Sequence, residues 1–160
     1  MLINIKAKVK IYIAHITNSY SQEFYLNLNR LKEMNVVIND LYEGDTYFSI
    51  KKNNILIDSL FGIGINKPIK GYWENLIEYI NQKNIDNIIS IDMPSGLFAE
   101  KPIQNYKGII KANHTLSFYA PKLAFLLPEF YKYVGIWHVL EFLPKKYLEN
   151  IFLKFKTTNY

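Results

Sequence analysis

Apolar and polar residues alternate at the start of the chain, and the pattern then changes to a helical spacing. The alternation over 3–13 predicts a strand whose regular part begins at Val9. Over about 20–34 the apolar residues recur every three or four positions, which predicts an amphipathic helix. Its apolar stripe is formed by Phe24, Leu28 and Leu31. Ser19 with Gln22 three positions later is a capping-box pattern, so we expect the helix to begin there.

Short apolar runs separated by polar breaks follow this helix. Residues 36–41 predict a second strand. The runs 55–60 and 88–91 are almost continuously apolar, a pattern typical of strands that are covered on both faces of a parallel sheet. Further strands are predicted at 115–118 and 134–142.

Two later segments have helical spacing. The first follows a glycine-containing loop, and its buried stripe is predicted to be Trp73, Leu76, Ile77 and Ile80. The second, 145–156, is predicted to be a short packing helix with an apolar stripe formed by Leu148, Ile151, Phe152 and Phe155. Strands that alternate with helices in this way imply right-handed crossovers, so we expect an open, mostly parallel α/β sheet.

Length and composition fit a single folded domain over 1–160. The 160 residues are 49% hydrophobic and 21% charged, which excludes disorder as the main state. We expect no membrane span, because no uncharged apolar stretch reaches the ~18 residues that one needs. The start of the chain does not read as a signal peptide, so we expect a cytoplasmic protein. The absence of cysteine excludes disulfides, thiolate metal sites and a cysteine nucleophile.

The net charge of +5 changes this picture little. Only Arg30 among the 19 basic residues is arginine, whereas recognition of base edges and phosphates favours arginine. The excess of lysine is typical of a solvated surface, and we expect no nucleic-acid partner.

The unusual polar residues gather where buried strands are predicted to end. Asp58 lies near the carboxyl end of one apolar run, and Asp92 ends the next. A carboxylate in such a run costs several kcal/mol unless it is paired or binds a cation. In an open α/β sheet, ligands bind beyond the carboxyl ends of the strands, so the two acids are candidates for one site. Asp58 can equally cap a turn.

Other chemistry is less well supported by the sequence. Gly62 and Gly64 do not continue into a dinucleotide fingerprint, because Lys67 stands at the third glycine position, although the loop leads into a helix and can bind an anion. Ser95 lacks the flanks of a nucleophile elbow. The three histidines are isolated and are interpreted as core or surface residues: His15, His114 and His138. Hard oxygen ligands such as Asp58 and Ser95 favour an alkali or alkaline-earth cation over a transition metal.

Several motifs in order resemble one known family. These are Ile57 to Pro68 with Gly71, then Ile91 to Leu97, then Ala112 to Phe118 and the pair Pro121 and Lys122. Over about residues 9–143 they resemble the NAD(P)H-hydrate epimerase family, the YjeF N-terminal domain. The resemblance implies a Rossmann-like α/β/α sandwich, often dimeric. It also implies an isomerase that interconverts the R and S hydrates of NADH and NADPH, called NADHX and NADPHX, and that works with a separate dehydratase.

The resemblance assigns roles to particular residues. Asp58 and Ser95 match positions that bind a potassium ion, and Asp92 matches an acid that contacts the substrate. The substrate-holding loop corresponds to Gly62, Ile63, Gly64, Ile65, Asn66, Lys67 and Pro68. Epimerisation needs a proton donor or acceptor within about 3 Å of the hydrated carbon, and Asp92 is our candidate. Lys122 is a candidate to contact a phosphate or to hold Asp92 ionised, against a plain surface role.

One part of the family pattern has no counterpart in this sequence. The family's domain opens with helices and a strand that lead to a loop of the Asn-Asn-Gly-Gly-Asp type. In this sequence the only two consecutive asparagines are Asn53 and Asn54, which stand at a different place in the pattern. We therefore expect the family's domain without roughly its N-terminal third, with a parallel sheet that lacks its first strand. Two alternatives to an epimerase stay open, namely a non-catalytic binding or dimerisation module and an inactive remnant.

Overall fold

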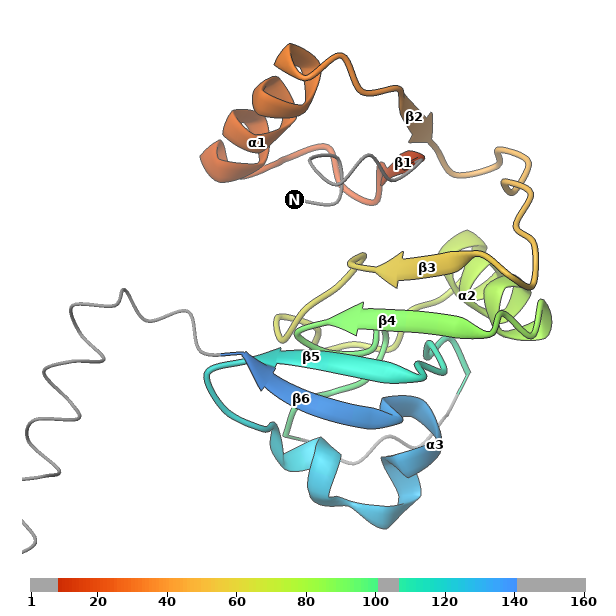
Figure 1. Ribbon diagram of the computed structural model, residues 1–160, viewed down its shortest axis with the longest axis vertical. Coiled ribbons are helices and arrows are strands. Elements are labelled where there is room, and N and C mark those ends of the chain that lie inside the picture. Colours follow the sequence, from red (N-terminus) through yellow and green to blue (C-terminus); the bar gives the residue numbers. More distant parts are fainter. Residues whose placement is uncertain (1–8, 101–106, 141–160) are drawn as a thin grey trace, which may run out of the picture. The chain divides into compact units, whose positions relative to one another are not determined.

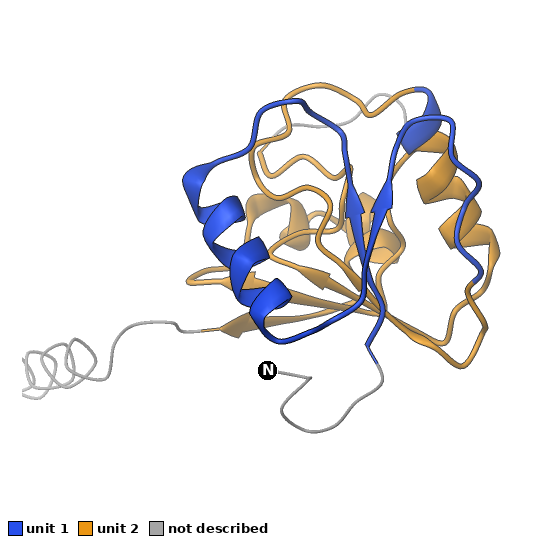
Figure 2. Ribbon diagram, turned by 90° about the horizontal axis from the view of Figure 1, so that it is seen from above, with its two compact units in different colours: residues 1–49, 71–73 blue, residues 50–70, 74–160 orange. Residues whose placement is uncertain are grey.

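The computed structural model describes residues 9–100 and 107–140, and the chain divides into two compact units (Figure 2). The first unit comprises 1–49 and 71–73. It holds strand β1 (Ile11–Ala14), helix α1 (Gln22–Glu33) and strand β2 (Ile38–Leu41). The two strands are parallel and in register from Ile11 opposite Ile38 to Ala14 opposite Leu41. This strand–helix–strand arrangement confirms the three elements expected here, and residues 3–8 of the predicted first strand lie outside the described residues.

The cap of α1 differs from the prediction. The helix begins at Gln22, and the Oγ atom of Ser21 accepts a hydrogen bond of 3.2 Å from the Phe24 backbone N–H. The backbone N–H of Ser19 instead donates to Thr17 Oγ1 at 3.1 Å. The predicted capping box at Ser19 is therefore wrong. Ser21 has the extended backbone that a capping residue needs, and its hydroxyl reaches a helical N–H that has no carbonyl partner.

We expect Ser21→Ala to lower the free energy of unfolding by about 1 kcal/mol, because one N–H of the first turn loses its acceptor. Ser19→Ala is the matched control and should change stability by less than about 0.5 kcal/mol. Urea unfolding followed by circular dichroism measures both. Equal effects of the two substitutions would contradict the assignment of the cap.

The second unit, 50–70 with 74–160, contains a four-stranded parallel sheet in the order β3-β4-β5-β6 (Figure 1). The strands are β3 (Ile55–Asp58), β4 (Asn87–Ile91), β5 (His114–Phe118) and β6 (Ile136–Leu140). Every neighbouring pair is parallel, which confirms the predicted α/β class with parallel strands.

Helix α2 (Tyr72–Gln82) lies in the chain between β3 and β4 and carries the predicted buried stripe. The residues of that stripe are at most 8% exposed: Trp73, Leu76, Ile77 and Ile80. After β5 the chain forms two 3-10 turns, η2 (Leu123–Leu126) and η3 (Pro128–Phe130), and the short helix α3 (Tyr131–Val134). These turns join the residues after β4 in one apolar core, whose members include Met93, Leu97, Ile109, Phe130 and Val134.

Two expectations about the sheet need correction or lie outside the structure. Strand β3 is not covered on both faces, because Ile55 is 65% exposed and Ile57 is 44% exposed at the edge of the sheet. The last strand begins at Ile136 rather than at 134, and residues 141–142 lie outside the described residues. The helix predicted at 145–156 also lies outside them.

Among the residues that the structure describes, no helix has the length and apolar character that a membrane crossing requires.

Candidate functional site

A buried carboxylate lies at the carboxyl end of β3. Asp58 is the last residue of this strand, lies opposite Ser90 of β4 and is 3% exposed. Its Oδ2 atom accepts hydrogen bonds from the Ser90 hydroxyl at 2.7 Å and from the Ser95 backbone N–H at 2.9 Å. Its Oδ1 atom accepts the Ser95 hydroxyl at 2.5 Å and the Leu60 N–H at 3.5 Å. The structure thus places Asp58 and Ser95, two of the predicted site residues, in direct contact.

Burial governs the electrostatics of Asp58. Removal from water raises the pKa of its carboxyl group, and the hydrogen bonds from Ser95, Ser90 and Leu60 act in the opposite direction without cancelling the effect. The ionised form is therefore disfavoured at this position unless further positive charge comes near. A cation bound beside the carboxylate supplies such charge.

The atoms around Asp58 are those that a hard cation prefers. The Ser95 hydroxyl oxygen lies 3.5 Å from the carbonyl oxygen of Phe61, so carboxylate, hydroxyl and carbonyl oxygens meet at one place. In the described part of the chain, no group of three or more His, Cys, Asp or Glu side chains is placed to hold a metal ion. The donor set at Asp58 consists of oxygen alone and fits an alkali cation such as potassium.

The turn that carries Ser95 is fixed by a close backbone approach. Gly96, with φ +91°, follows Ser95, and a Cβ atom added there would lie 1.9 Å from the carbonyl oxygen of Gly108. Only glycine fits such a place. The carbonyl of Ser95 accepts the Ile110 N–H at 2.9 Å, so the serine that bonds Asp58 is held from both sides.

A second acid lies directly after β4. Asp92 has φ +66°, a conformation that non-glycine residues adopt rarely and that is often found at functional sites. Its backbone N–H donates to Leu116 O at 2.8 Å. Its Oδ1 atom lies 3.1 Å from Lys122 Nζ, and both side chains are mostly buried, at 15% and 18% exposed. The hydrogen bond to β5 and the ion pair with Lys122 thus both stabilise Asp92 in this strained conformation.

Lys122 is the ion-pair partner of Asp92. Besides Asp92, its ammonium group donates to the carbonyl oxygen of Phe118 at 3.1 Å. The sequence left open whether Lys122 contacts a phosphate, assists Asp92 or lies at the surface. The structure places it against the carboxylate, where it fixes the orientation of Oδ1.

We expect Lys122→Met to lower the free energy of unfolding by about 1–3 kcal/mol, because Asp92 would stay mostly buried without its cation. In Asp92→Asn the same lysine substitution should cost less, since no carboxylate charge is then left unpaired. A double-mutant cycle in urea measures this coupling. Additive effects would show that the ion pair contributes nothing to stability.

The predicted substrate loop begins beside Asp92. A Cβ atom added to Gly62 would lie 3.6 Å from Asp92 Oδ2, which is ordinary van der Waals contact. The N–H of Phe61 donates to Ser95 Oγ at 3.0 Å and ties the start of the loop to the Asp58 cluster. Farther along, Ile65 packs against the apolar core, whereas Gly64, Asn66 and Lys67 are exposed. Asp92, Ser95 and an open backbone loop therefore form one neighbourhood at this edge of the sheet.

The sequence interpretation missed Ser90, which is fully buried and bonds Asp58. The available signal was a lone hydroxyl inside the apolar run 88–91, but its meaning depends on the register that sets Ser90 opposite Asp58. The histidines lie elsewhere. His15 bonds Asp40 and Tyr20 in the first unit, and His114 pairs with His138 across β5 and β6 at 3.3 Å.

Comparisons with known proteins point in one direction. The family model described as YjeF-related protein N-terminus matches residues 1–124. The NAD(P)H-hydrate epimerase of Bordetella bronchiseptica is 34% identical over 88 residues, which cover 53% of this chain and 38% of that protein. The bifunctional NAD(P)H-hydrate repair enzyme Nnr of Thermofilum pendens is 30% identical over 107 residues, which cover 66% of this chain and 20% of that protein. The matched segment thus spans well under half the length of either relative.

The fold also matches a solved structure. Yeast YNL200c superposes with a TM-score of 0.57 at 20% sequence identity, over 88% of this chain and 58% of that one. At this level of identity the match shows a shared α/β fold with parallel strands.

Proposed function

Because this chain belongs to the family of YjeF-related N-terminal domains, we propose that it is an NAD(P)H-hydrate epimerase, which interconverts the R and S forms of NADHX and NADPHX. The observation that carries the proposal is the neighbourhood at the strand ends. There Asp92, with its strained backbone and lysine partner, lies next to Gly62, the first residue of an exposed loop. The family includes curated epimerases, which supports the substrate class.

Asp92 is assigned the proton transfer. Its Oδ1 atom is held by Lys122, while the Oδ2 atom is near Gly62, where the predicted substrate loop begins. A carboxylate in this position can take the proton of the hydrate's hydroxyl as the bond between the carbon that carries this hydroxyl and the ring nitrogen breaks, which leaves an aldehyde. When the nitrogen adds back to the other face of the aldehyde, the carboxylic acid returns the proton to the oxygen and the carbon is inverted. The loop residues Gly62 to Pro68 would bind the cofactor hydrate through backbone groups, and Lys67 can contact its phosphates.

Asp58 and Ser95 are assigned to a potassium ion. When bound, the ion supplies positive charge that offsets the buried carboxylate and can attract the anionic substrate. Ser90 and the Ser95 N–H orient Asp58 from the other side. These residues thus hold the carboxylate and the ion in a fixed position next to the start of the loop.

We further propose the setting in which the enzyme works. The chain acts in the cytoplasm on a soluble cofactor, as a single domain and as a homodimer. The S hydrate that it forms is passed to an NAD(P)H-hydrate dehydratase. Relatives named as bifunctional repair enzymes, from Thermofilum pendens and Vibrio cholerae, support a functional link between the two activities.

A coupled assay tests the proposal. The R hydrate of NADHX is supplied with an excess of an S-specific dehydratase and ATP, and its disappearance is followed with and without this chain, in potassium or N-methylglucamine chloride. We expect acceleration that depends on protein concentration and is larger in potassium. No acceleration in either salt would show that the chain is not an epimerase on its own. That is the result expected of a non-catalytic binding module or of an inactive remnant.

A further inference from the structure

Two residues with left-handed backbones lie at the carboxyl ends of neighbouring strands. Among the residues that the structure describes, four non-glycine residues have a positive φ: Asn35, Asn84, Asp92 and Tyr119. The two asparagines follow the ends of α1 and α2, where a left-handed residue commonly terminates a helix. Asp92 and Tyr119 have no such explanation, because they directly follow the parallel strands β4 and β5.

Tyr119 is the more unusual of the two. Its φ of +64° is rare for a bulky side chain, whereas aspartate adopts this region more readily. The Tyr119 N–H donates to Leu140 O at 3.1 Å, and the N–H of Ala120 donates to Phe118 O at 2.7 Å, so the backbone is fixed on both sides. The side chain contributes little to the core, because the residue is 65% exposed. Strain that is not offset by packing is typical of functional sites.

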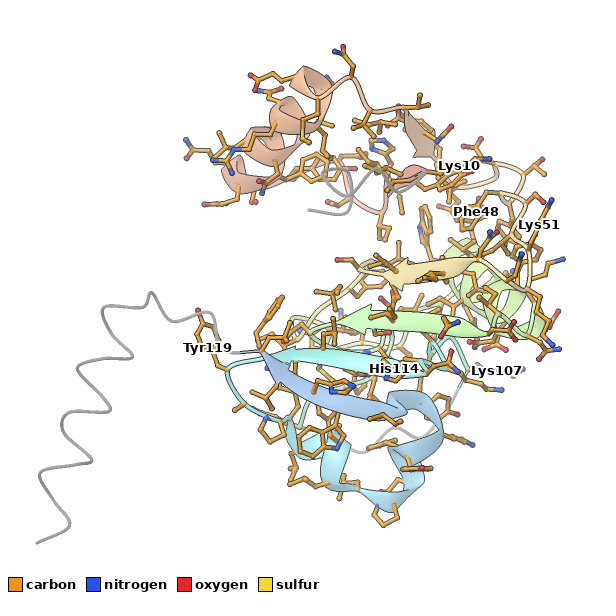
Figure 3. All side chains as sticks on the ribbon, viewed as in Figure 1. Lys10, Phe48, Lys51, Lys107, His114 and Tyr119 are labelled. Atoms are coloured by element: carbon orange, nitrogen blue, oxygen red, sulfur yellow. The ribbon has the colours of Figure 1, made fainter. Side chains whose placement is uncertain are left out.

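Tyr119 directly follows the residue that contacts both members of the Asp92–Lys122 ion pair. The N–H of Phe118 donates to Asp92 Oδ1 at 3.4 Å, and its carbonyl oxygen accepts from Lys122 Nζ at 3.1 Å. The carboxyl ends of the four parallel strands lie at one edge of the sheet. Figure 3 shows the side chain of Tyr119 projecting from this edge, whereas His114 marks the amino end of the same strand. An exposed aromatic ring is thus close to the carboxylate to which proton transfer is assigned.

The order of the strands decides which part of a dinucleotide the ring can meet. Asp58 ends β3, Asp92 follows β4 and Tyr119 follows β5, which are neighbours in this order. The loop 62–68, to which phosphate binding is assigned, comes after β3 and begins beside Asp92. A substrate with its phosphates on this loop and its reacting ring at Asp92 therefore has Tyr119 on the far side of the reacting ring. Its adenine lies beyond the phosphates, away from Tyr119.

We propose that the ring of Tyr119 stacks on the nicotinamide-derived ring of the hydrate, a contact that rests on the epimerase function proposed above. In the hydrate this ring keeps one carbon–carbon double bond, which is conjugated with the ring nitrogen and the carboxamide, so that part of it is flat. An aromatic side chain can cover such a flat surface and remove it from water. Tyr119 thus selects ligands that carry this ring, and the strained backbone is retained because it directs the side chain to the site.

Binding of two probes, measured by isothermal titration calorimetry, tests this contact. NADH carries the nicotinamide ring, whereas ADP-ribose has the same adenosine and phosphates without it. We expect Tyr119→Leu to weaken NADH binding about 5- to 100-fold, the range of one lost stacking contact, and to change ADP-ribose binding less than twofold. Tyr119→Phe keeps the ring and should bind both probes within twofold of the unsubstituted chain. Tyr131→Leu is the matched control and should change neither, because Tyr131 is 74% exposed on α3, which precedes the amino end of β6.

Unchanged NADH binding in Tyr119→Leu would overturn the proposal. Equal weakening of both probes, or no binding of NADH by the unsubstituted chain, would also overturn it. Tyr119→Gly gives a second readout, since glycine adopts a positive φ without strain. It should weaken NADH binding like Tyr119→Leu without lowering the midpoint of thermal unfolding, and a lower midpoint would assign the ring a structural role instead.

The epimerase proposal and the stacking contact fail in different ways. If the unsubstituted chain binds NADH through Tyr119 but does not accelerate the loss of the R hydrate, the epimerase function is wrong and the ring contact stands. If Tyr119→Leu epimerises the R hydrate with an unchanged KM, the function stands and the contact is wrong. If both are correct, Tyr119→Leu should raise KM for the R hydrate about 5- to 100-fold, the same range as for NADH binding.

Discussion

Asp92→Asn is expected to lower the epimerisation rate about 10²- to 10⁴-fold, the range that a positioned acid or base contributes. The amide cannot take up the proton that the reaction moves. The substitution keeps the size of the side chain, and its carbonyl oxygen can still accept from Lys122, which lies 3.1 Å from Asp92 Oδ1 in the structure. The coupled assay with R hydrate and excess dehydratase measures the rate, and single-turnover conditions separate it from binding.

A matched control is available for this prediction. Asp86→Asn makes the same chemical change at an exposed carboxylate that pairs with Lys52 at 3.6 Å. It should leave the rate within twofold of the unsubstituted enzyme. If Asp92→Asn is folded and its rate also stays within threefold, proton transfer belongs to another group. That result would leave the epimerase proposal itself intact.

The parts of the fold that the sequence predicted are those that local periodicity determines. The stripe of α2 could be predicted because Trp73, Leu76, Ile77 and Ile80 recur at helical spacing and all of them pack inward. The first residue of α1 could not be predicted. Ser19 and Ser21 are both good capping residues, and only the conformation of the backbone determines which of them caps the helix. The exposure of Ile55 and Ile57 was missed for a similar reason, because an apolar run does not tell an edge strand from a central one.

The candidate site also has residues that the sequence could predict and contacts that it could not. Asp58 and Asp92 were predicted as site residues because each is an acid near the end of an apolar run, and Ser95 because the family resemblance pairs it with Asp58. The partners of these residues depend on register and on tertiary contacts. Ser90 meets Asp58 only because β3 and β4 are aligned as they are, and Lys122 reaches Asp92 across 30 positions of chain. A single sequence carries no direct record of either contact.

Potassium is expected to stabilise the protein against unfolding, and more strongly at pH 8 than at pH 5. Burial raises the pKa of the Asp58 carboxyl group above its unfolded value. Stability contributed by the protonated form of such a group is fully present below the unfolded pKa and is lost as the pH rises through the folded pKa. Over that range the carboxylate becomes charged inside the protein, and a bound cation then restores part of the lost stability.

The measurement is the midpoint of thermal unfolding in potassium chloride and in N-methylglucamine chloride at equal ionic strength. At a potassium concentration 100 times the dissociation constant, binding to the native state alone contributes about 2.7 kcal/mol. In Asp58→Asn the difference between the two salts should disappear at both pH values, because the oxygen site loses its charge. Asp86→Asn should keep it, since that carboxylate is exposed and directly precedes β4, whereas Ser95 follows the opposite end of that strand. A potassium effect that survives Asp58→Asn would place the ion elsewhere, and equal midpoints in the two salts for the unsubstituted protein would contradict potassium binding at the end of β3.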